Sequence, residues 1–119
     1  MTTESGYNQL TPGGGFAEPV HLMGESLPGA SVDLLDADIT PTRTFGTYEY
    51  RFCPSNAGVL SVIFRKTGES DRTQTEYGGA TLTAGAAYPA RIIVPVGWSV
   101  NFRYSGADSG TYDLIVREI

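Results

Sequence analysis

The sequence is poor in the side chains that most metal sites and nucleophilic active sites use. Its 119 residues include one histidine, His21, and one cysteine, Cys53. A metal site needs further His, Cys or carboxylate ligands at matched spacing, and none lies near His21 in the sequence. We therefore interpret His21 as an outward-facing or edge histidine and Cys53 as a buried or half-buried structural thiol. A single cysteine also excludes a disulfide bond within the chain.

Positive charge is scarce as well. Lys66 is the one lysine, the other basic residues are arginines, and 13 acidic residues bring the net charge to −5 at pH 7. Nucleic-acid binding depends on a basic face that neutralises phosphates, and binding to an anionic membrane surface has the same requirement. We therefore expect neither a nucleic acid nor a membrane as a partner.

Long apolar runs and catalytic motifs are missing too. No stretch approaches the roughly 18 apolar residues that a membrane-spanning helix needs. Residues 1–6 have neither the basic nor the apolar segment of a secretory signal peptide, so we expect synthesis in the cytoplasm without one. The nucleotide-binding loops and the nucleophile motif of hydrolases do not occur. The sequence predicts a protein that is not an enzyme and uses no cofactor.

What the chain does contain is glycine, tyrosine, phenylalanine and an apolar pattern of period two. Such alternation is typical of strands, and no stretch has the 3.6-residue period of a helix. The expected strands are residues 20–23, 47–52, 59–65, 80–83, 88–96, 98–104 and 112–117; residues 31–35 are a further candidate, and residues 73–77 are a β-rich segment. Their spacing favours a single-domain, all-β sandwich of seven to eight antiparallel strands that resembles a jelly roll. The last three strands read as two hairpins in series.

The first residues differ in composition from the rest. Residues 1–17 are rich in Thr, Ser, Gly and Asn, and residues 12–15 read Pro-Gly-Gly-Gly. Consecutive glycines disfavour any regular element because the chain loses so much conformational freedom in forming one. We predict an extended or flexible N-terminal arm at residues 1–17 and a β-sandwich domain at residues 18–119.

Two sets of side chains are candidate binding groups. Asp33, Asp36 and Asp38 could supply oxygen ligands to Ca²⁺, or they could be turn-forming residues with solvated charges. Trp98, Tyr104 and Tyr112 could form an aromatic platform for a sugar ring, or they could belong to the core because they alternate with polar residues.

The arginines point to a third kind of surface. Arg91, Arg103 and Arg117 lie opposite the apolar faces of their expected strands, while Arg43 lies in a loop. Arginine is enriched over lysine in protein interfaces because its planar guanidinium forms bidentate pairs. This composition favours contacts between subunits.

The C-terminal half carries a resemblance to a known class of proteins. Residues 79–88 (GATLTAGAAY), 94–103 (VPVGWSVNFR) and 114–118 (LIVRE) carry it. Over residues 58–119 the chain resembles small all-β structural proteins of virions, the capsid decoration and fibre-type domains of tailed phages and related viruses. The resemblance implies a non-catalytic protein that is made in the host cytoplasm and resides in the virion. It implies a homo-oligomer, with a trimer favoured, bound to a capsid or tail lattice protein and with an arm that reaches a neighbour.

Two functions from different classes follow from these observations. The first is a virion structural protein that acts as a capsid decoration, turret or fibre component. The alternative is a carbohydrate-binding β-sandwich module that binds a glycan on Trp98, Tyr104 and Tyr112, with calcium at the aspartates.

Overall fold

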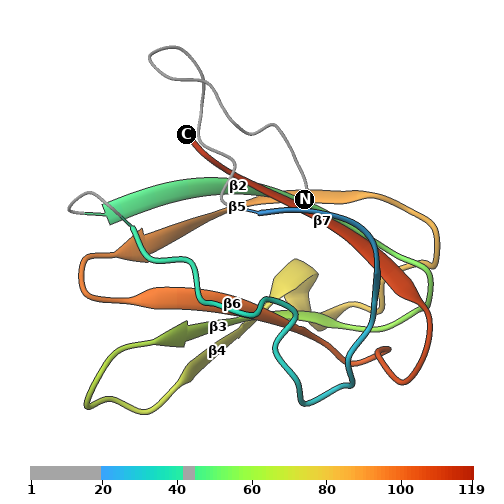
Figure 1. Ribbon diagram of the computed structural model, residues 1–119, viewed down its shortest axis with the longest axis horizontal. Coiled ribbons are helices and arrows are strands. Elements are labelled where there is room, and N and C mark those ends of the chain that lie inside the picture. Colours follow the sequence, from blue (N-terminus) through green and yellow to red (C-terminus); the bar gives the residue numbers. More distant parts are fainter. Residues whose placement is uncertain (1–19, 42–44) are drawn as a thin grey trace.

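The fold is a sandwich of two antiparallel sheets. The computed structural model describes residues 20–41 and 45–119, so the arm predicted at residues 1–17 lies outside the described residues. Figure 1 shows the sheets as two layers. The strands are β1 (Val20–Ser26), β2 (Phe45–Pro54), β3 (Leu60–Arg65), β4 (Arg72–Thr75), β5 (Tyr88–Pro95), β6 (Ser99–Tyr104) and β7 (Thr111–Glu118), and η1 (Glu76–Gly79) is a single 3-10 turn. No helix in the described part of the chain is long and apolar enough to cross a membrane.

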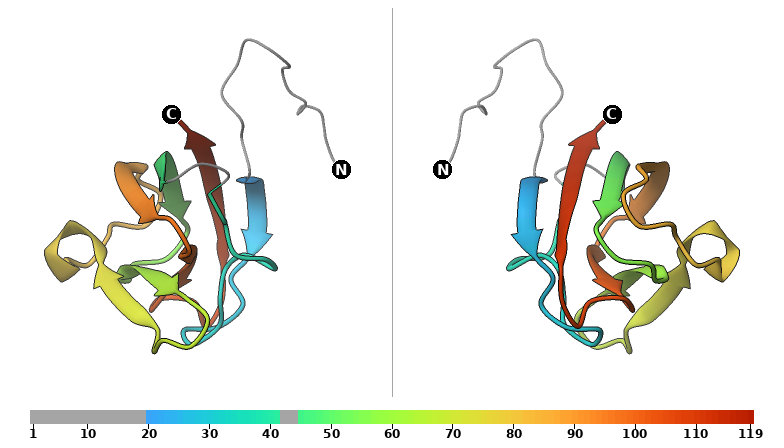
Figure 2. Two further views of the ribbon diagram at one scale, coloured as in Figure 1. Left: turned by 90° about the vertical axis from the view of Figure 1, so that its left-hand side faces the viewer. Right: turned by 90° about the vertical axis from the view of Figure 1, so that its right-hand side faces the viewer.

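The strand order follows one rule. The four-stranded sheet has the order β1-β7-β2-β5 and the three-stranded sheet the order β4-β3-β6. Three of the pairs are nested about the middle of the described chain: β3 pairs with the next strand, β4; β2 pairs with β5; and β1 pairs with β7. This pairing is that of one long hairpin whose strands are divided between two layers. Figure 2 shows the layers from two further sides.

Strand β6 pairs with β3 along one side, and residues 34–39 lie along its other side. The Leu34 N–H donates to the Phe102 carbonyl at 2.8 Å, and Ile39 exchanges two backbone hydrogen bonds with Val100. This segment occupies the place of an eighth strand beside β6, although it is too irregular to be one. Eight positions paired end to end make a jelly roll, so the expected all-β sandwich of seven to eight strands is confirmed.

The core lies between the sheets and is built from alternate residues of each strand. Its largest members come from β2 and β6, where Tyr50 packs edge-on against Phe102 with ring centroids 5.3 Å apart, and Phe52 against Tyr104 at 5.0 Å. Edge-to-face ring pairs contribute about 0.5–1.5 kcal/mol beyond the area they bury. The fully buried side chains also include Leu60, Val62, Val94, Val100, Leu114 and Val116.

Two of the expected strands and both expected C-terminal hairpins are wrong. Residues 31–35 form turns and bends, and residues 80–83 contribute one isolated bridge, between Leu82 and Gly58. Strand β6 lies in a different sheet from β5 and β7, so the links before and after it cross between layers. Alternation shows which face of a strand is buried, but strands of either layer bury one face in the same core and look alike in sequence.

Candidate functional site

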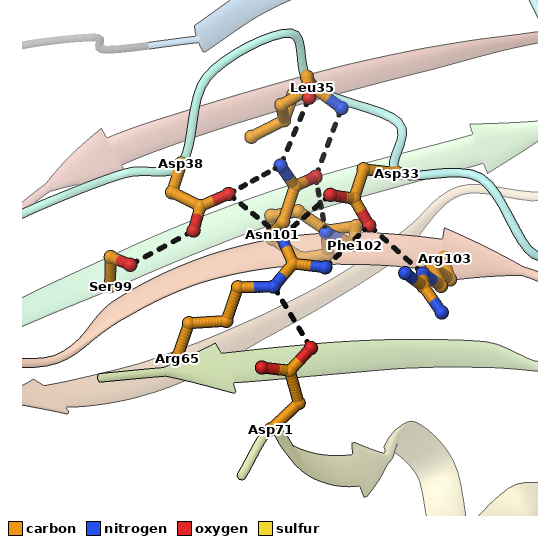
Figure 3. Close-up of polar contacts among 9 residues, drawn as sticks. All are labelled: Asp33, Leu35, Asp38, Arg65, Asp71, Ser99, Asn101, Phe102 and Arg103. Atoms are coloured by element: carbon orange, nitrogen blue, oxygen red, sulfur yellow. Dashed lines mark hydrogen bonds and ion pairs between the residues drawn. The ribbon is translucent and has the colours of Figure 1, made fainter. Parts of the chain in front are cut away.

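A charged cluster covers the outer side of the three-stranded sheet (Figure 3). Arg65, the last residue of β3, donates to both carboxylate oxygens of Asp33 at 2.6 and 3.0 Å. Its guanidinium also contacts Asp38 at 3.0 Å and Asp71 at 3.1 Å. Arg103 on β6 contacts Asp33 from the other side at 2.9 Å. The cluster therefore ties the segment at residues 33–38 to β3 and β6.

These charges stabilise one another in their ionised forms. Hydrogen bonding to Arg65 is the main cause of a lowered pKa at Asp33, and Arg103 adds to it. The same pairing with Asp33 raises the pKa of the Arg65 guanidinium. A carboxylate held ionised in this way is a poor proton donor, so the cluster is suited to holding a loop in place rather than to general acid catalysis.

Asn101 lies at the centre of the cluster and is 1% exposed. Its amide oxygen accepts from the Leu35 N–H at 3.0 Å and the Phe102 N–H at 2.8 Å. Its amide nitrogen donates to the Leu35 carbonyl at 3.0 Å and to Asp38 at 2.9 Å. All four hydrogen-bonding positions of the side chain are used. This residue is an anchor that the sequence analysis missed, since polar residues at alternate positions of a strand usually face solvent.

The three aspartates predicted as calcium ligands do not converge. Asp33 and Asp38 both accept from Arg65, whereas Asp36 is exposed at the tip of the loop. Among the described residues, no group of three or more His, Cys, Asp or Glu side chains is arranged to hold a metal ion. The guanidinium of Arg65 occupies the position that a cation would need.

The predicted aromatic platform is also wrong for two of its three members. Tyr104 and Tyr112 are 0% and 3% exposed, and their hydroxyls donate to the backbone carbonyls of Asn56 at 2.5 Å and Leu34 at 2.8 Å. Burial raises the pKa of each tyrosine to about 12. Both rings belong to the core, the other interpretation of their alternation.

Trp98 is the member of that set that stays accessible. It precedes β6, is partly buried against the core, and borders a cavity of about 510 Å³. Cationic groups of Lys66 and Arg72 lie 5.8 and 5.5 Å from the ring centroid. The cavity is lined by Asp38, Thr40, Arg65, Lys66, Thr67, Asp71, Gly97, Trp98 and Ser99.

A buried carboxylate lies at the other end of the three-stranded sheet. Glu76 in η1 is 7% exposed and accepts from the Tyr50 hydroxyl at 2.6 Å and from the Gln74 amide at 2.8 Å. Burial, followed by the bond to Glu76, raises the pKa of Tyr50 far above its ordinary value. The next residue, Tyr77, has a φ of 55°, a backbone conformation that residues other than glycine rarely adopt. Its hydroxyl donates to the Pro89 carbonyl. These contacts fix the turn after β4.

The outer face of the four-stranded sheet carries the arginines. Glu49 on β2 lies between Arg91 on β5 and Arg117 on β7, at 3.8 and 3.2 Å. In the next row, Arg51 lies between Pro89 and Ile115. The Arg51 side chain is exposed and makes no hydrogen bond or ion pair within the described residues.

We call this surface the arginine face; it comprises Glu49, Arg51, Pro89, Arg91, Ile93, Asp113, Ile115 and Arg117. A shallow depression of about 370 Å³ lies on it. Its three guanidiniums outnumber its two carboxylates in a chain whose net charge is −5. The face is therefore the basic side of an acidic protein. Of the arginines that the sequence assigned to outward positions, Arg91 and Arg117 meet here, whereas Arg103 joins the charged cluster. Arg43 lies outside the described residues.

The lone histidine and cysteine lie at the edge and outer side of the four-stranded sheet. His21 is exposed on β1, as the sequence indicates, and Cys53 is half-buried in β2 with a free thiol. Cys53 and Asp113 face each other across β2 and β7. Neither residue is near the Trp98 cavity or among the residues that line it.

No model of a known protein family and no curated protein matches this chain.

Proposed function

We propose that this chain is a non-catalytic structural subunit of a virion, a capsid decoration, turret or fibre component that acts through contacts between subunits. The arginine face is the observation that carries the proposal. Viral capsid domains are among the proteins that use the jelly roll, which supports the setting, but lectins and cupins share the fold. The fold by itself does not select among these functions, which differ in the surface that each protein presents.

The composition of the arginine face fits a protein interface. Arginine is enriched at such surfaces, and Ile93 adds an apolar side chain that is 60% exposed on this face. Arg51 has no partner among the described residues, so a neighbouring carboxylate could pair with it. The pairing would not require breaking an existing ion pair.

The two edges of the four-stranded sheet are less suited to subunit contacts than its outer face. Strand β5 carries Pro89 and Pro95, which cannot donate a backbone hydrogen bond to an added strand. Strand β1 has an irregular register between Leu22 and Glu25, which interrupts its ladder. Both features are devices that discourage edge-to-edge pairing.

Charge also selects the geometry of assembly. Two arginine faces packed on each other would bring guanidiniums together, so a two-fold contact of face on face is disfavoured. A face that binds an acidic surface of the next copy makes a head-to-tail contact, and such contacts close into rings. This geometry agrees with the trimer favoured by the resemblance and leaves other surfaces for a capsid or tail lattice protein.

An acidic depression beside β1 is the complementary surface that we propose. It has a volume of about 310 Å³, and its lining combines Glu25 and Asp36 with the apolar side chains of Leu22, Leu34 and Leu35. Both carboxylates contribute to the raised pKa of nearby Tyr112, after burial, so they act on one region. An arginine and an isoleucine from the neighbouring arginine face match this mixture of charge and apolar surface.

The test is the mass of the full-length chain in solution at low micromolar concentration, measured by light scattering. We expect a trimer or larger closed ring, which Arg51→Glu dissociates. Arg72→Glu is the matched control, because Arg72 is also exposed but lies on β4 of the other sheet. Adding Asp36→Arg to Arg51→Glu should restore assembly by reversing both charges.

Two results would contradict the proposal. A wild-type chain that stays monomeric removes the subunit contact altogether. An oligomer that is equally sensitive to Arg51→Glu and Arg72→Glu places the interface elsewhere.

A further inference from the structure

The cavity beside Trp98 has a lining that suits a particular kind of small molecule. Its volume of about 510 Å³ lies within the range of small-ligand pockets, roughly 300–1,000 Å³. Drug-like and lipid ligands need mostly apolar walls, whereas here Trp98 is the one large apolar side chain in the lining. The ligand must therefore be polar over most of its surface and apolar on one side.

The polar groups around the cavity are balanced in charge. The lining contains two carboxylates, Asp38 and Asp71, and two cations, Arg65 and Lys66. Its remaining polar side chains carry hydroxyl groups. A charged ligand would need an excess of the opposite charge, which the lining does not offer. Hydroxyl groups both donate and accept, so a neutral polyol can use carboxylates, cations and hydroxyls together.

Several of these groups have bonding capacity left over. One carboxylate oxygen of Asp71 accepts from Arg65 at 3.1 Å, while its other oxygen has no partner among the described residues. Lys66 forms no ion pair in that part of the chain, and the Trp98 side chain makes no hydrogen bond there.

The indole ring is accessible to a stacking partner. Lys66 and Arg72 lie near it, but both are long, exposed side chains, and cation–π contacts at exposed sites are weak. Either cation can move aside for a ring. A pyranose has axial C–H groups on one face and hydroxyls around its rim, which matches one indole within a polar wall.

We propose that the cavity beside Trp98 binds a neutral saccharide, with a pyranose ring stacked on the indole and its hydroxyls bonded to Asp71, Lys66 and Thr67. This site shares no lining residue with the arginine face or with the acidic depression beside β1. It is therefore independent of the proposed subunit contact. A virion protein with such a site could contact glycans on a surface while it remains bound to its lattice.

The chain offers a direct spectroscopic test, because Trp98 is its only tryptophan. Its fluorescence reports on this cavity alone. The full-length protein is titrated with glucose, galactose, mannose, N-acetylglucosamine and their disaccharides. Glucuronate and glucosamine serve as the anionic and cationic counterparts. We expect a saturable change in emission with at least one neutral sugar and a weaker response to its charged counterpart.

Two acidic residues of the same loop provide a matched pair of variants. Asp71 lines the cavity, whereas Glu69 is exposed to a similar extent and does not. Asp71→Ala should weaken binding about tenfold, the loss expected for a charged hydrogen bond. Glu69→Ala should leave the affinity within about twofold. Trp98→Ala should abolish binding in calorimetry, and Thr67→Ala provides a second lining change that leaves the indole and its packing in place.

Three results would overturn the inference: no saturable response to any neutral sugar of the panel, preferential binding of a charged sugar, or equal affinities in Asp71→Ala and Glu69→Ala. None of them bears on the mass measurement at the arginine face.

Discussion

Asn101 is the residue whose loss should reveal how the irregular segment at residues 34–39 is held. Its side chain is buried and forms four hydrogen bonds, two of them to the N–H and carbonyl of Leu35. In Asn101→Ala these two backbone groups and the Phe102 N–H lose their side-chain partner while the loop still covers them. The amide's bond to Asp38 also disappears, but Asp38 keeps Arg65 and Ser99.

The cost can be worked from these contacts. A buried backbone group left without a partner costs about 1–3 kcal/mol. With three such groups, and with partial relief when water enters the vacated space, we expect Asn101→Ala to lower the free energy of unfolding by roughly 3 kcal/mol. A domain of about 100 residues loses about 4–8 °C of Tm per kcal/mol. The expected decrease in Tm is therefore about 15 °C.

Thermal and urea unfolding, followed by circular dichroism, measure this effect. Ser99→Ala is the control, because the half-buried Ser99 hydroxyl gives Asp38 a single bond at 3.0 Å, and its loss should cost about 1 kcal/mol or less. Equal stability of the two variants would show that the Asn101 side chain does not anchor this segment. The segment would then be held by its backbone bonds to β6 and by the burial of its leucines.

Three further predictions concern other parts of the chain. Tyr50→Phe removes the hydroxyl that donates to the buried Glu76 carboxylate at 2.6 Å, and it should lower the free energy of unfolding, measured in urea at pH 7, by about 1–2 kcal/mol. An unchanged free energy of unfolding would mean that water replaces the hydroxyl. The pKa of Asp33 is lowered in the folded state, chiefly by Arg65, so its stabilisation is complete above the ordinary pKa of 3.8 and is lost as pH falls through the lowered value. Between about pH 4 and pH 2 the urea midpoint of the wild type should therefore fall more steeply than that of Asp33→Asn. Deletion of residues 1–17 leaves all described strands in the chain, so the Tm should stay within about 3 °C of the wild type. The mass in solution should fall, because the arm is expected to connect subunits.

Local alternation was enough to predict most of the strands and the core. The patterns at residues 47–52 and 98–104 are regular because one side of each strand packs into the core while the other faces solvent or a covering loop. The structure buries Tyr48, Tyr50 and Phe52 as that pattern requires. The same pattern says nothing about which strands pair, because pairing depends on groups that every backbone has. The layer of β6 could therefore not be predicted.

The segment at residues 34–39 shows a second limit. Its buried residues, Leu34, Leu35 and Ile39, have no period of two, because the chain bulges outward between Leu35 and Ile39. It is held by side chains that are far away in the sequence, above all Asn101, which lies 66 residues beyond Leu35. No local pattern could indicate contacts of this range.

The aromatic residues show why a binding surface is harder to predict than a core. Trp98 and Tyr104 are an even number of residues apart in the alternating segment 98–104. The alternation therefore assigns both rings to the same face of the strand. They differ because Trp98 precedes β6 at the rim of the sandwich, whereas Tyr104 ends that strand beneath the turn at Gly58. Both rings lie at an end of β6, so whether a ring is buried there depends on the segment that covers that end, which local alternation does not indicate.

The end-to-end pairing of the jelly roll also explains why neither proposed surface has a sequence motif. The arginine face takes its arginines from β2, β5 and β7, so Arg51 and Arg117 are neighbours only after the middle and the last third of the chain have met. The Trp98 cavity likewise joins Asp38 to Lys66 and Trp98. The two surfaces share no residue, and they require different chemistry: an excess of positive charge for an acidic neighbour, and a charge-balanced lining for a neutral sugar. One fold can therefore carry both, and evidence for one surface neither supports nor weakens the other.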